Sequence, residues 1–258
     1  MFFDSHVHFD RFSADGSLPT VLEQAEEAGV CQMMAVGGMA PANELAYSLA
    51  QKYPNRIYAS AGYDRDEALE ELDFSALRLF LRDPLVKAVG ETGLDYFYKA
   101  DTATAQKKLF AEHLALAVEF NKPLIVHSRD ADEDTLAMLA DFADAWKGDA
   151  AQKGILHCFT RDLSFARKVL DLGLLISFSG ILTFANADPL REVATYVPID
   201  RLLIETDAPY LAPIPKRGNR NEPAFVVHTA KQLAQLKELP LESLAKITTQ
   251  NARAVFAL

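Results

Sequence analysis

The chain has 258 residues, half of them hydrophobic, with a formal net charge of −10 and an isoelectric point near 5.1. A chain of this length can bury a full hydrophobic core. Its net negative charge argues against extended, sequence-independent binding along a nucleic-acid duplex. Two cysteines are too few for a disulfide framework, and no apolar run reaches the roughly 20 residues that a bilayer requires. We therefore expect a cytoplasmic protein without a membrane segment or a secretory signal.

Short β-rich runs alternate with amphipathic stretches along the whole chain. The predicted strands are Phe2–Val7, Gln32–Val36, Ile57–Ala61, Val86–Gly90, Leu124–Val126, Gly154–Leu156, Leu174–Phe178 and Leu202–Ile204. Helical spacing of apolar residues predicts helices at Pro19–Ala28, Ala42–Lys52, Thr102–Phe120, Ala131–Trp146, Leu163–Leu172, Pro189–Tyr196 and in the tail, Leu241–Leu258.

Alternation of eight strands with helices predicts parallel strands joined by right-handed crossovers. For a chain of this length it favours a (β/α)8 TIM barrel, with residues 1–258 forming a single domain. An open doubly wound sheet is the alternative, but no glycine-rich phosphate loop follows any predicted strand. Two longer connections, Thr92–Ala100 and Ala208–Glu222, are expected to form walls of the active-site mouth.

The sequence His6-Val7-His8 lies at the end of the first predicted strand. Side chains alternate along a strand, so both imidazoles face the same way and can share one cation. Further metal-ligand residue types lie at the ends of strands four, five, six and eight: Glu91, His127, His157 and Asp207. Because strand ends converge at one mouth of a barrel, we expect all six to meet there, whereas isolated core or surface residues would not line up in this way.

Six ligands are more than one tetrahedral metal site needs, but they suit two divalent cations. Glu91 is the natural candidate for a carboxylate that bridges the two. Mixed nitrogen and oxygen ligands suit Zn, Mn, Co or Fe, whereas Mg prefers oxygen alone. The choice among Mg, Mn, Zn and Co stays open.

The chain resembles the TatD-type metal-dependent hydrolases and deoxyribonucleases of the amidohydrolase superfamily over almost its whole length. The motifs that carry this resemblance are Asp4-Ser5-His6-Val7-His8, Gly90-Glu91-Thr92-Gly93-Leu94-Asp95-Tyr96, Pro123-Leu124-Ile125-Val126-His127-Ser128-Arg129, His157-Cys158-Phe159, Ile176-Ser177-Phe178-Ser179-Gly180, Leu203-Ile204-Glu205-Thr206-Asp207-Ala208-Pro209-Tyr210-Leu211 and Arg220-Asn221-Glu222-Pro223.

The resemblance implies a particular sharing of the ligands. It places His6, His8, Glu91 and Asp207 around one metal, and Glu91, His127 and His157 around the second. One departure concerns the third strand end, where the family shows Gly-x-His-Pro and this chain reads Gly62-Tyr63-Asp64-Arg65. We interpret Tyr63 as the residue that replaces the family histidine, and we expect it to contact substrate.

Two arginines are further candidates for binding substrate. Arg129 follows His127 by two residues and can hold a phosphate oxygen, or it can form a loop salt bridge. Arg220 belongs to the basic run Lys216–Arg220, which can grip a nucleic-acid strand or be a solvated loop.

Residues beside the ligands have less definite roles. By strand alternation, Glu205 and Asp4 face the same side as the ligands Asp207 and His6, so each can orient a metal-bound histidine or be a solvated interior carboxylate. Cys158 is expected to point away from His157 into the packing. His113 and His228 lie on predicted helices and are expected to be structural or solvated.

The ligand set and the resemblance favour a divalent-metal-dependent phosphodiester hydrolase, and the resemblance implies that it removes nucleotides from DNA ends. Asp207 would orient the attacking water and accept its proton, with Glu91 between the metals. A metal-dependent amidase, deacylase or lactonase acting on a small substrate is the alternative, and a non-catalytic barrel is a third reading. The expected partner is a DNA or other nucleic-acid end, with no obligatory protein partner.

Overall fold

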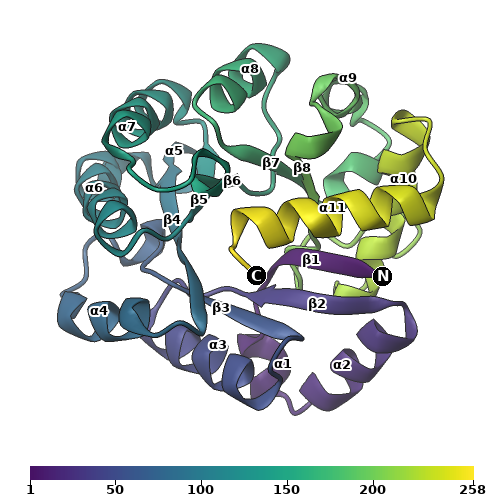
Figure 1. Cartoon of the computed structure of the whole chain (residues 1–258), viewed down its shortest axis with the longest axis horizontal. Helices are drawn as coiled ribbons and strands as arrows, with labels where there is room; N and C mark the ends of the chain where they lie inside the picture. The colour runs from purple at the N-terminus through teal and green to yellow at the C-terminus, as the bar shows by residue number, and fades with distance from the viewer.

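The computed structural model describes residues 1–258 and shows a barrel of eight parallel strands in the order β1-β2-β3-β4-β5-β6-β7-β8 (Figure 1). The strands are β1 (Phe2–Val7), β2 (Val30–Ala35), β3 (Ile57–Ala61), β4 (Val86–Asp95), β5 (Leu124–Arg129), β6 (Gly154–Leu156), β7 (Leu175–Phe178) and β8 (Leu202–Ile204). The predicted TIM barrel, its eight strands and its single domain are confirmed.

Helices surround the barrel. They are α1 (Asp10–Ala14), α2 (Leu18–Glu27), α3 (Ala40–Lys52), α4 (Phe74–Arg82), α5 (Tyr96–Lys99), α6 (Ala103–Phe120), α7 (Asp132–Ala145), α8 (Leu163–Asp171), α9 (Asp188–Tyr196), α10 (Val226–Leu236) and α11 (Leu241–Val255). The tail helix α11 packs against β1 and β8, as Figure 1 shows. None of these helices has the length and apolar character needed to span a membrane.

The barrel closes through contacts that continue just beyond the ends of β1 and β8. Val7 forms a parallel bridge with Ala208, and the Asp207 amide donates to the His6 carbonyl at 3.0 Å. The buried Asp4 carboxylate accepts hydrogen bonds from the Thr206 amide at 2.9 Å and from the Thr206 hydroxyl at 2.6 Å. The first and last strands are thus joined next to the residues expected to bind metal.

Glycine at position 62 permits the close approach of β3 and β4 near the mouth. A Cβ atom at Gly62 would lie 2.8 Å from the Gly90 Cα, which is shorter than side-chain contacts allow. Gly90 directly precedes Glu91, so a larger residue at position 62 would displace the backbone that carries this carboxylate.

His113 on α6 is fully buried and behaves as part of the core. Its Nε2 accepts the Tyr63 amide at 2.8 Å, and its Nδ1 lies 2.8 Å from the Leu109 carbonyl oxygen, so the ring fits a neutral tautomer with the proton on Nδ1. Burial lowers the pKa of His113 to about 4. The expectation that this histidine is structural is confirmed.

The low pKa of His113 predicts a loss of stability in acid. Below pH 6.5, its ordinary value, the unfolded chain binds a proton that the folded protein does not bind. The free energy of unfolding should therefore fall from pH 6.5 to about pH 4, by about 3 kcal/mol in total from this group. His113→Gln should remove this component of the pH dependence in denaturant unfolding measured across that range.

The matched control is His228→Gln, at a half-buried histidine on α10. This variant should keep most of the wild-type slope of stability against pH. If His113→Gln kept the full wild-type slope instead, His113 would not be the neutral buried group that the structure indicates.

Candidate metal centre

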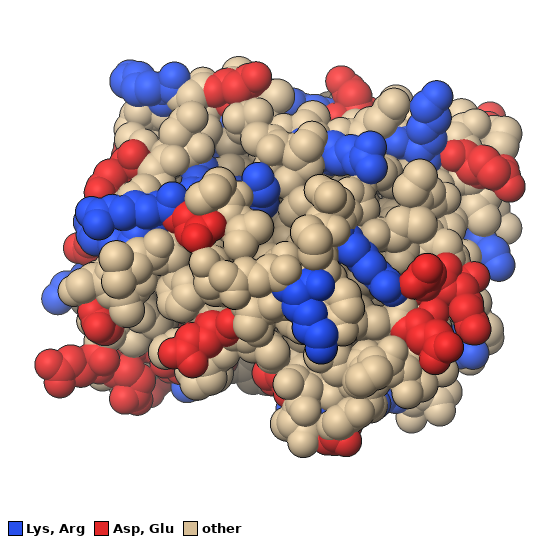
Figure 2. Space-filling view, turned by 60° about the horizontal axis from the view of Figure 1, so that its bottom comes forward, with Lys and Arg blue, Asp and Glu red and all other residues tan.

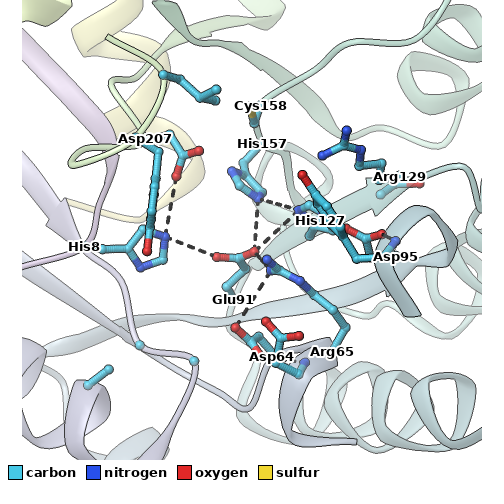
Figure 3. A pocket seen from close by; sticks show the side chains of 18 of the residues that line it. His8, Asp64, Arg65, Glu91, Asp95, His127, Arg129, His157, Cys158 and Asp207 are labelled. Atoms are coloured by element: carbon cyan, nitrogen blue, oxygen red, sulfur yellow. Dashed lines mark hydrogen bonds and ion pairs between the residues drawn. The ribbon is translucent and has the colours of Figure 1, made fainter. Parts of the chain in front are cut away.

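Six potential metal ligands converge at the carboxyl end of the barrel, as the strand ends predict. They are His6 in β1 and His8 just after it, Glu91 in β4, His127 in β5, His157 directly after β6, and Asp207, which follows β8 by three residues. Figure 3 shows Glu91 between the His8 and Asp207 side of the pocket and the His127 side. Residues up to 201 positions apart in the chain thus share one cluster.

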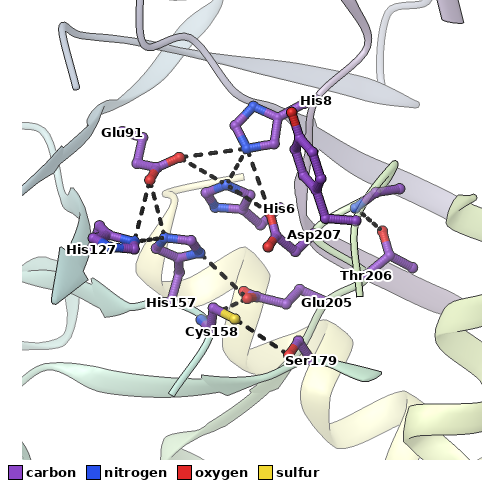
Figure 4. Close-up of polar contacts among 12 residues, drawn as sticks. His6, His8, Glu91, His127, His157, Cys158, Ser179, Glu205, Thr206 and Asp207 are labelled. Carbon is purple, nitrogen blue, oxygen red and sulfur yellow. Dashed lines mark hydrogen bonds and ion pairs between the residues drawn. The ribbon is translucent and has the colours of Figure 1, made fainter. Parts of the chain in front are cut away.

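Each oxygen of the buried Glu91 carboxylate faces its own pair of histidines. Oε2 lies 3.3 Å from His6 Nε2 and 3.5 Å from His8 Nε2. Oε1 lies 3.3 Å from His157 Nε2 and 3.5 Å from His127 Nδ1 (Figure 4). The two oxygens of one buried carboxylate thus face two separate pairs of imidazoles, and all five side chains carry atoms that can bind a metal ion.

The donor atoms fit divalent metal ions. His6 Nε2 lies 3.1 Å from His8 Nε2, and His127 Nδ1 lies 3.3 Å from His157 Nε2, so the ring nitrogens of each pair converge on one point. Asp207 Oδ1 lies 3.5 Å from His8 Nε2. Groups of ligand atoms within 4.8 Å of one another are formed by His6, His8 and Asp207, by Glu91, His127 and His157, and by His6, His157 and Glu205.

The charge state of the cluster follows from burial and from close neighbours. Burial would raise the pKa of Glu91, but the positive charges of Arg65 and His157 hold this pKa well below its usual range. Burial would lower the pKa of His157, but the carboxylates of Glu91 and Glu205 raise it to about 10. The Glu91 carboxylate is therefore stabilised by positive charge from the Arg65 and His157 side of the cluster.

Two carboxylates contact the ligand histidines from behind. Glu205 Oε1 lies 3.4 Å from His157 Nδ1, which agrees with one of the roles considered for Glu205 (Figure 4). Asp95 Oδ2 lies 3.1 Å from His127 Nε2, a contact that our sequence analysis missed. Such contacts fix the tautomer and orientation of a ligating imidazole. The period of two along β4 could have identified Asp95, because it shares a face with Glu91.

Asp4 does not orient a histidine ring. Its side chain binds Thr206 and accepts the His6 backbone amide at 3.4 Å. Burial raises the pKa of Asp4 to about 8, partly offset by the bonds from Thr206. Its role is therefore to join β1 to the segment after β8.

A pocket of about 750 Å³ opens over the cluster. The sequence predicted an irregular connection over Thr92–Ala100, and this prediction is wrong. Strand β4 continues to Asp95, and Tyr96–Lys99 forms the short helix α5. The Asp95 carboxylate accepts the Phe97 and Tyr98 amides at 2.9 Å each and so starts this short helix. Asp95 and Tyr98 line the pocket, as do Tyr210 and Leu211 from the second expected wall.

The structure does not support Tyr63 as a substrate contact. Its side chain is 3% exposed, its hydroxyl donates to the Asp73 carbonyl at 2.9 Å, and its ring packs on Phe74. The next two residues, Asp64 and Arg65, line the pocket instead. The family histidine in Gly-x-His-Pro therefore corresponds to Asp64, because Tyr63 occupies the variable position and points into the core.

Arg65 is the pocket residue that sequence reasoning overlooked most clearly. Its guanidinium donates to Glu91 Oε1 and lies 3.8 Å from Asp64 Oδ2, as Figure 3 shows. It belongs to a short helical turn after β3, Arg65–Glu67, outside the regular strand. Strand alternation therefore gave no signal for this side chain.

The two arginines selected from the sequence occupy different places. Arg129 lines the pocket. Arg220 does not line it and instead contacts Asp15 and the Ser17 hydroxyl on the surface. The expectation that Arg220 contacts substrate at the pocket is therefore not supported, because a local ion pair holds its guanidinium.

Cys158 also departs from its expected orientation, because it lines the pocket beside His157. The backbone at Cys158 has φ of +46°, which breaks the alternation of side chains at the end of β6. The Cys158 amide donates to Glu205 Oε1 at 2.6 Å, and its thiol lies 3.4 Å from the Ser179 hydroxyl. Burial raises the pKa of the thiol well above its usual value, so Cys158 is a weak nucleophile.

A barrel with such ligands at its mouth is the architecture of a metal-dependent hydrolase. A model of the family described as TatD related DNase matches residues 3–257, and the chain belongs to this family. The metal-dependent hydrolase YcfH of Escherichia coli K12, described as uncharacterized, is 42% identical over 256 residues, which cover 98% of this chain and 94% of that protein.

Two further proteins are similar over nearly their whole length. The 3'-5' ssDNA/RNA exonuclease TatD of Edwardsiella piscicida is 36% identical over 262 residues, which cover 99% of each chain. The crystal structure of YJJV, a TatD homologue from E. coli K12, matches with a TM-score of 0.88 and 28% identity, covering 100% of this chain and 98% of that one. The chain is therefore a metal-dependent hydrolase of the TatD family.

The contact between Glu205 and His157 predicts an effect on metal affinity. Glu205→Gln keeps the shape of the side chain but removes the charge beside His157 Nδ1, so the affinity for Zn²⁺ or Mn²⁺ should fall by about 10- to 100-fold in calorimetric titration. Glu112→Gln on the exposed face of α6 should bind metal as the parent does. Parental affinity in Glu205→Gln would show that Glu205 does not support the metal centre.

Proposed function

We propose that this protein is a divalent-metal-dependent phosphodiesterase that removes nucleotides from DNA ends. The observation that carries the proposal is the Glu91 carboxylate, whose two oxygens face two separate histidine pairs. Paired cations suit in-line phosphoryl displacement, because they stabilise both the attacking and the leaving oxygen. The exonuclease name of the Edwardsiella relative gives independent support.

The ligands divide into two sets in this proposal. His6, His8 and Asp207 would hold one cation, His127 and His157 would hold the other, and Glu91 would contribute to both. When bound, the cations supply positive charge that acidifies water and offsets negative charge on the phosphoryl oxygens. Zn, Mn and Co suit these nitrogen and oxygen donors, and Mg is included in the test below.

Asp207 is the proposed proton acceptor. It lines the pocket, and its side chain is 13% exposed, so a water in the pocket can reach it. Burial would raise the pKa of Asp207, but hydrogen bonding and charge from His8 and His6 keep it below the usual value. The carboxylate is therefore ionised at neutral pH and able to orient a water and take its proton.

Arg129 is the proposed contact for a phosphate oxygen. The other pocket arginine, Arg65, is paired with Glu91, whereas Arg129 contacts aromatic rings and keeps its donors available. A planar guanidinium can hold two phosphate oxygens at once. This contact also stabilises the charge that develops during phosphoryl transfer.

The proposed function is tested with metal-free protein loaded in turn with Mg, Mn, Co or Zn. The substrates are free-ended and end-blocked single strands of DNA and RNA, together with simple esters, amides and lactones. Release of mononucleotides from free ends alone supports the proposal. Cleavage of esters, amides or lactones alone would replace it with a small-substrate hydrolase, and inactivity with every metal and substrate would contradict any hydrolytic role.

Substitution of Asp207 tests its role in the reaction. Asp207→Asn should lower kcat by about 10²- to 10⁴-fold, because the amide cannot accept the proton of the attacking water. Thermal unfolding should show that the fold is retained. The control is Asp200→Asn. Asp200 is exposed and lies just before the start of β8, at the end of the strand away from the ligands, so this variant should have parental activity. A parental rate in Asp207→Asn would exclude Asp207 as the proton acceptor.

A further inference from the structure

Exposed aromatic side chains gather at the mouth of the barrel. The exposed aromatic residues of the protein are Phe97, Tyr98, Tyr196 and Tyr210, with exposed fractions of 55%, 70%, 47% and 45%. Tyr98 and Tyr210 line the pocket, and Phe97 packs against Tyr98 with ring centroids 4.8 Å apart. Only Tyr196, at the end of α9, belongs to the outer ring of helices. Exposed apolar surface concentrated at one site indicates a binding role.

The aromatic pair lies beside a guanidinium that has no carboxylate partner. Arg129 lies 4.0 Å from the centre of the Phe97 ring and 4.6 Å from the centre of the Tyr98 ring. These contacts hold Arg129 beside the two rings, and its N–H groups, which have no carboxylate partner, are free for an anion. The large exposed fraction of Tyr98 leaves much of its ring open to the pocket.

The position of this group relative to the metal ligands defines what it can bind. Asp95 ends β4 next to His127, and its carboxylate fixes the turn that presents Phe97 and Tyr98. Figure 3 shows Arg129 on the His127 side of the pocket, away from Asp207. A phosphate held over the ligand cluster would therefore have the aromatic pair to one side, where the base of the same nucleotide unit can stack.

We propose that Phe97, Tyr98 and Arg129 form a nucleobase-binding subsite that stacks an unpaired base next to the phosphodiester to be cleaved. This inference rests on the proposed function and extends it to an unpaired strand end. Stacking suits any base, because each presents a π face, so the subsite selects unpaired nucleotides rather than a sequence. A base inside a duplex is covered by its neighbours and cannot use it.

The test compares intact single-stranded oligonucleotides with strands in which one of the two nucleotides at the attacked end is abasic. Loss of the base at one of these positions should lower kcat/KM of the parent protein by about tenfold, as expected for one stacking contact. The variant carrying Phe97→Ala and Tyr98→Ala should lose at least this factor on the intact strand, because it removes the stack and the rings that position Arg129. Since the stack is already absent in this variant, removing the end base should lower its kcat/KM little further.

The control is Tyr196→Ala, which removes another exposed tyrosine that lies beside an arginine, with Arg167 4.9 Å from the ring centre. This variant should keep parental kinetics on every strand. A second measurement uses chelator-treated protein, in which cleavage is stopped, and an oligonucleotide with a terminal 2-aminopurine. Stacking should quench its fluorescence with the parent protein and with Tyr196→Ala, but not with the double variant.

The outcomes separate the subsite from the proposed function. If the parent cleaves strands without regard to the end bases, or if the double variant retains the parental preference, the subsite is wrong and the phosphodiesterase proposal stands. If no strand is cleaved, the proposed function fails, and the fluorescence measurement decides whether the aromatic pair binds a base. Equal quenching by parent and double variant overturns the subsite in either case.

Discussion

The buried carboxylate of Glu91 is the feature on which the rest of the site depends. A buried negative charge is costly unless it is paired, and here Arg65 and the four histidines surround it. The four histidines form two pairs because each oxygen of the carboxylate faces one pair of imidazoles. Arg65 therefore supplies a positive charge directly beside this carboxylate, in addition to the histidines.

Closure of the barrel brings this carboxylate and its partners into register. The first and last strands meet through Asp4 and Thr206 and through the backbone bond from Asp207 to His6. These contacts lie within a few residues of three ligands, so the closure that completes the fold also places His6, His8 and Asp207 together. A displacement of β8 relative to β1 would separate these ligands while leaving the other histidine pair in place.

The fold and the convergence of the six candidate ligands could be predicted because each of these residues lies in a regular strand or within three residues of its end. Alternation along β1, β4 and β5 orients His6, Glu91 and His127 correctly, and a barrel brings strand ends together. The failures occur where the backbone leaves this regularity. Cys158 has a positive φ, and the turn after β3 points Tyr63 into the core and brings the next two residues to the pocket. The prediction for Arg220 was not supported for another reason. Its ion pair with Asp15 joins segments far apart in the sequence, so no local sequence pattern indicated it.

The charge distribution agrees with recognition of a strand end rather than of a long duplex. Figure 2 shows basic and acidic side chains interspersed over one face, and neither sign forms a continuous stripe there. Binding along a duplex needs many phosphate contacts, which a chain with a net charge of −10 is poorly suited to supply. Binding at a single nucleotide needs fewer phosphate contacts, and in the proposed subsite Arg129, Phe97 and Tyr98 would supply them together with bound metal. Affinity would then depend on stacking and on metal, and only weakly on salt concentration.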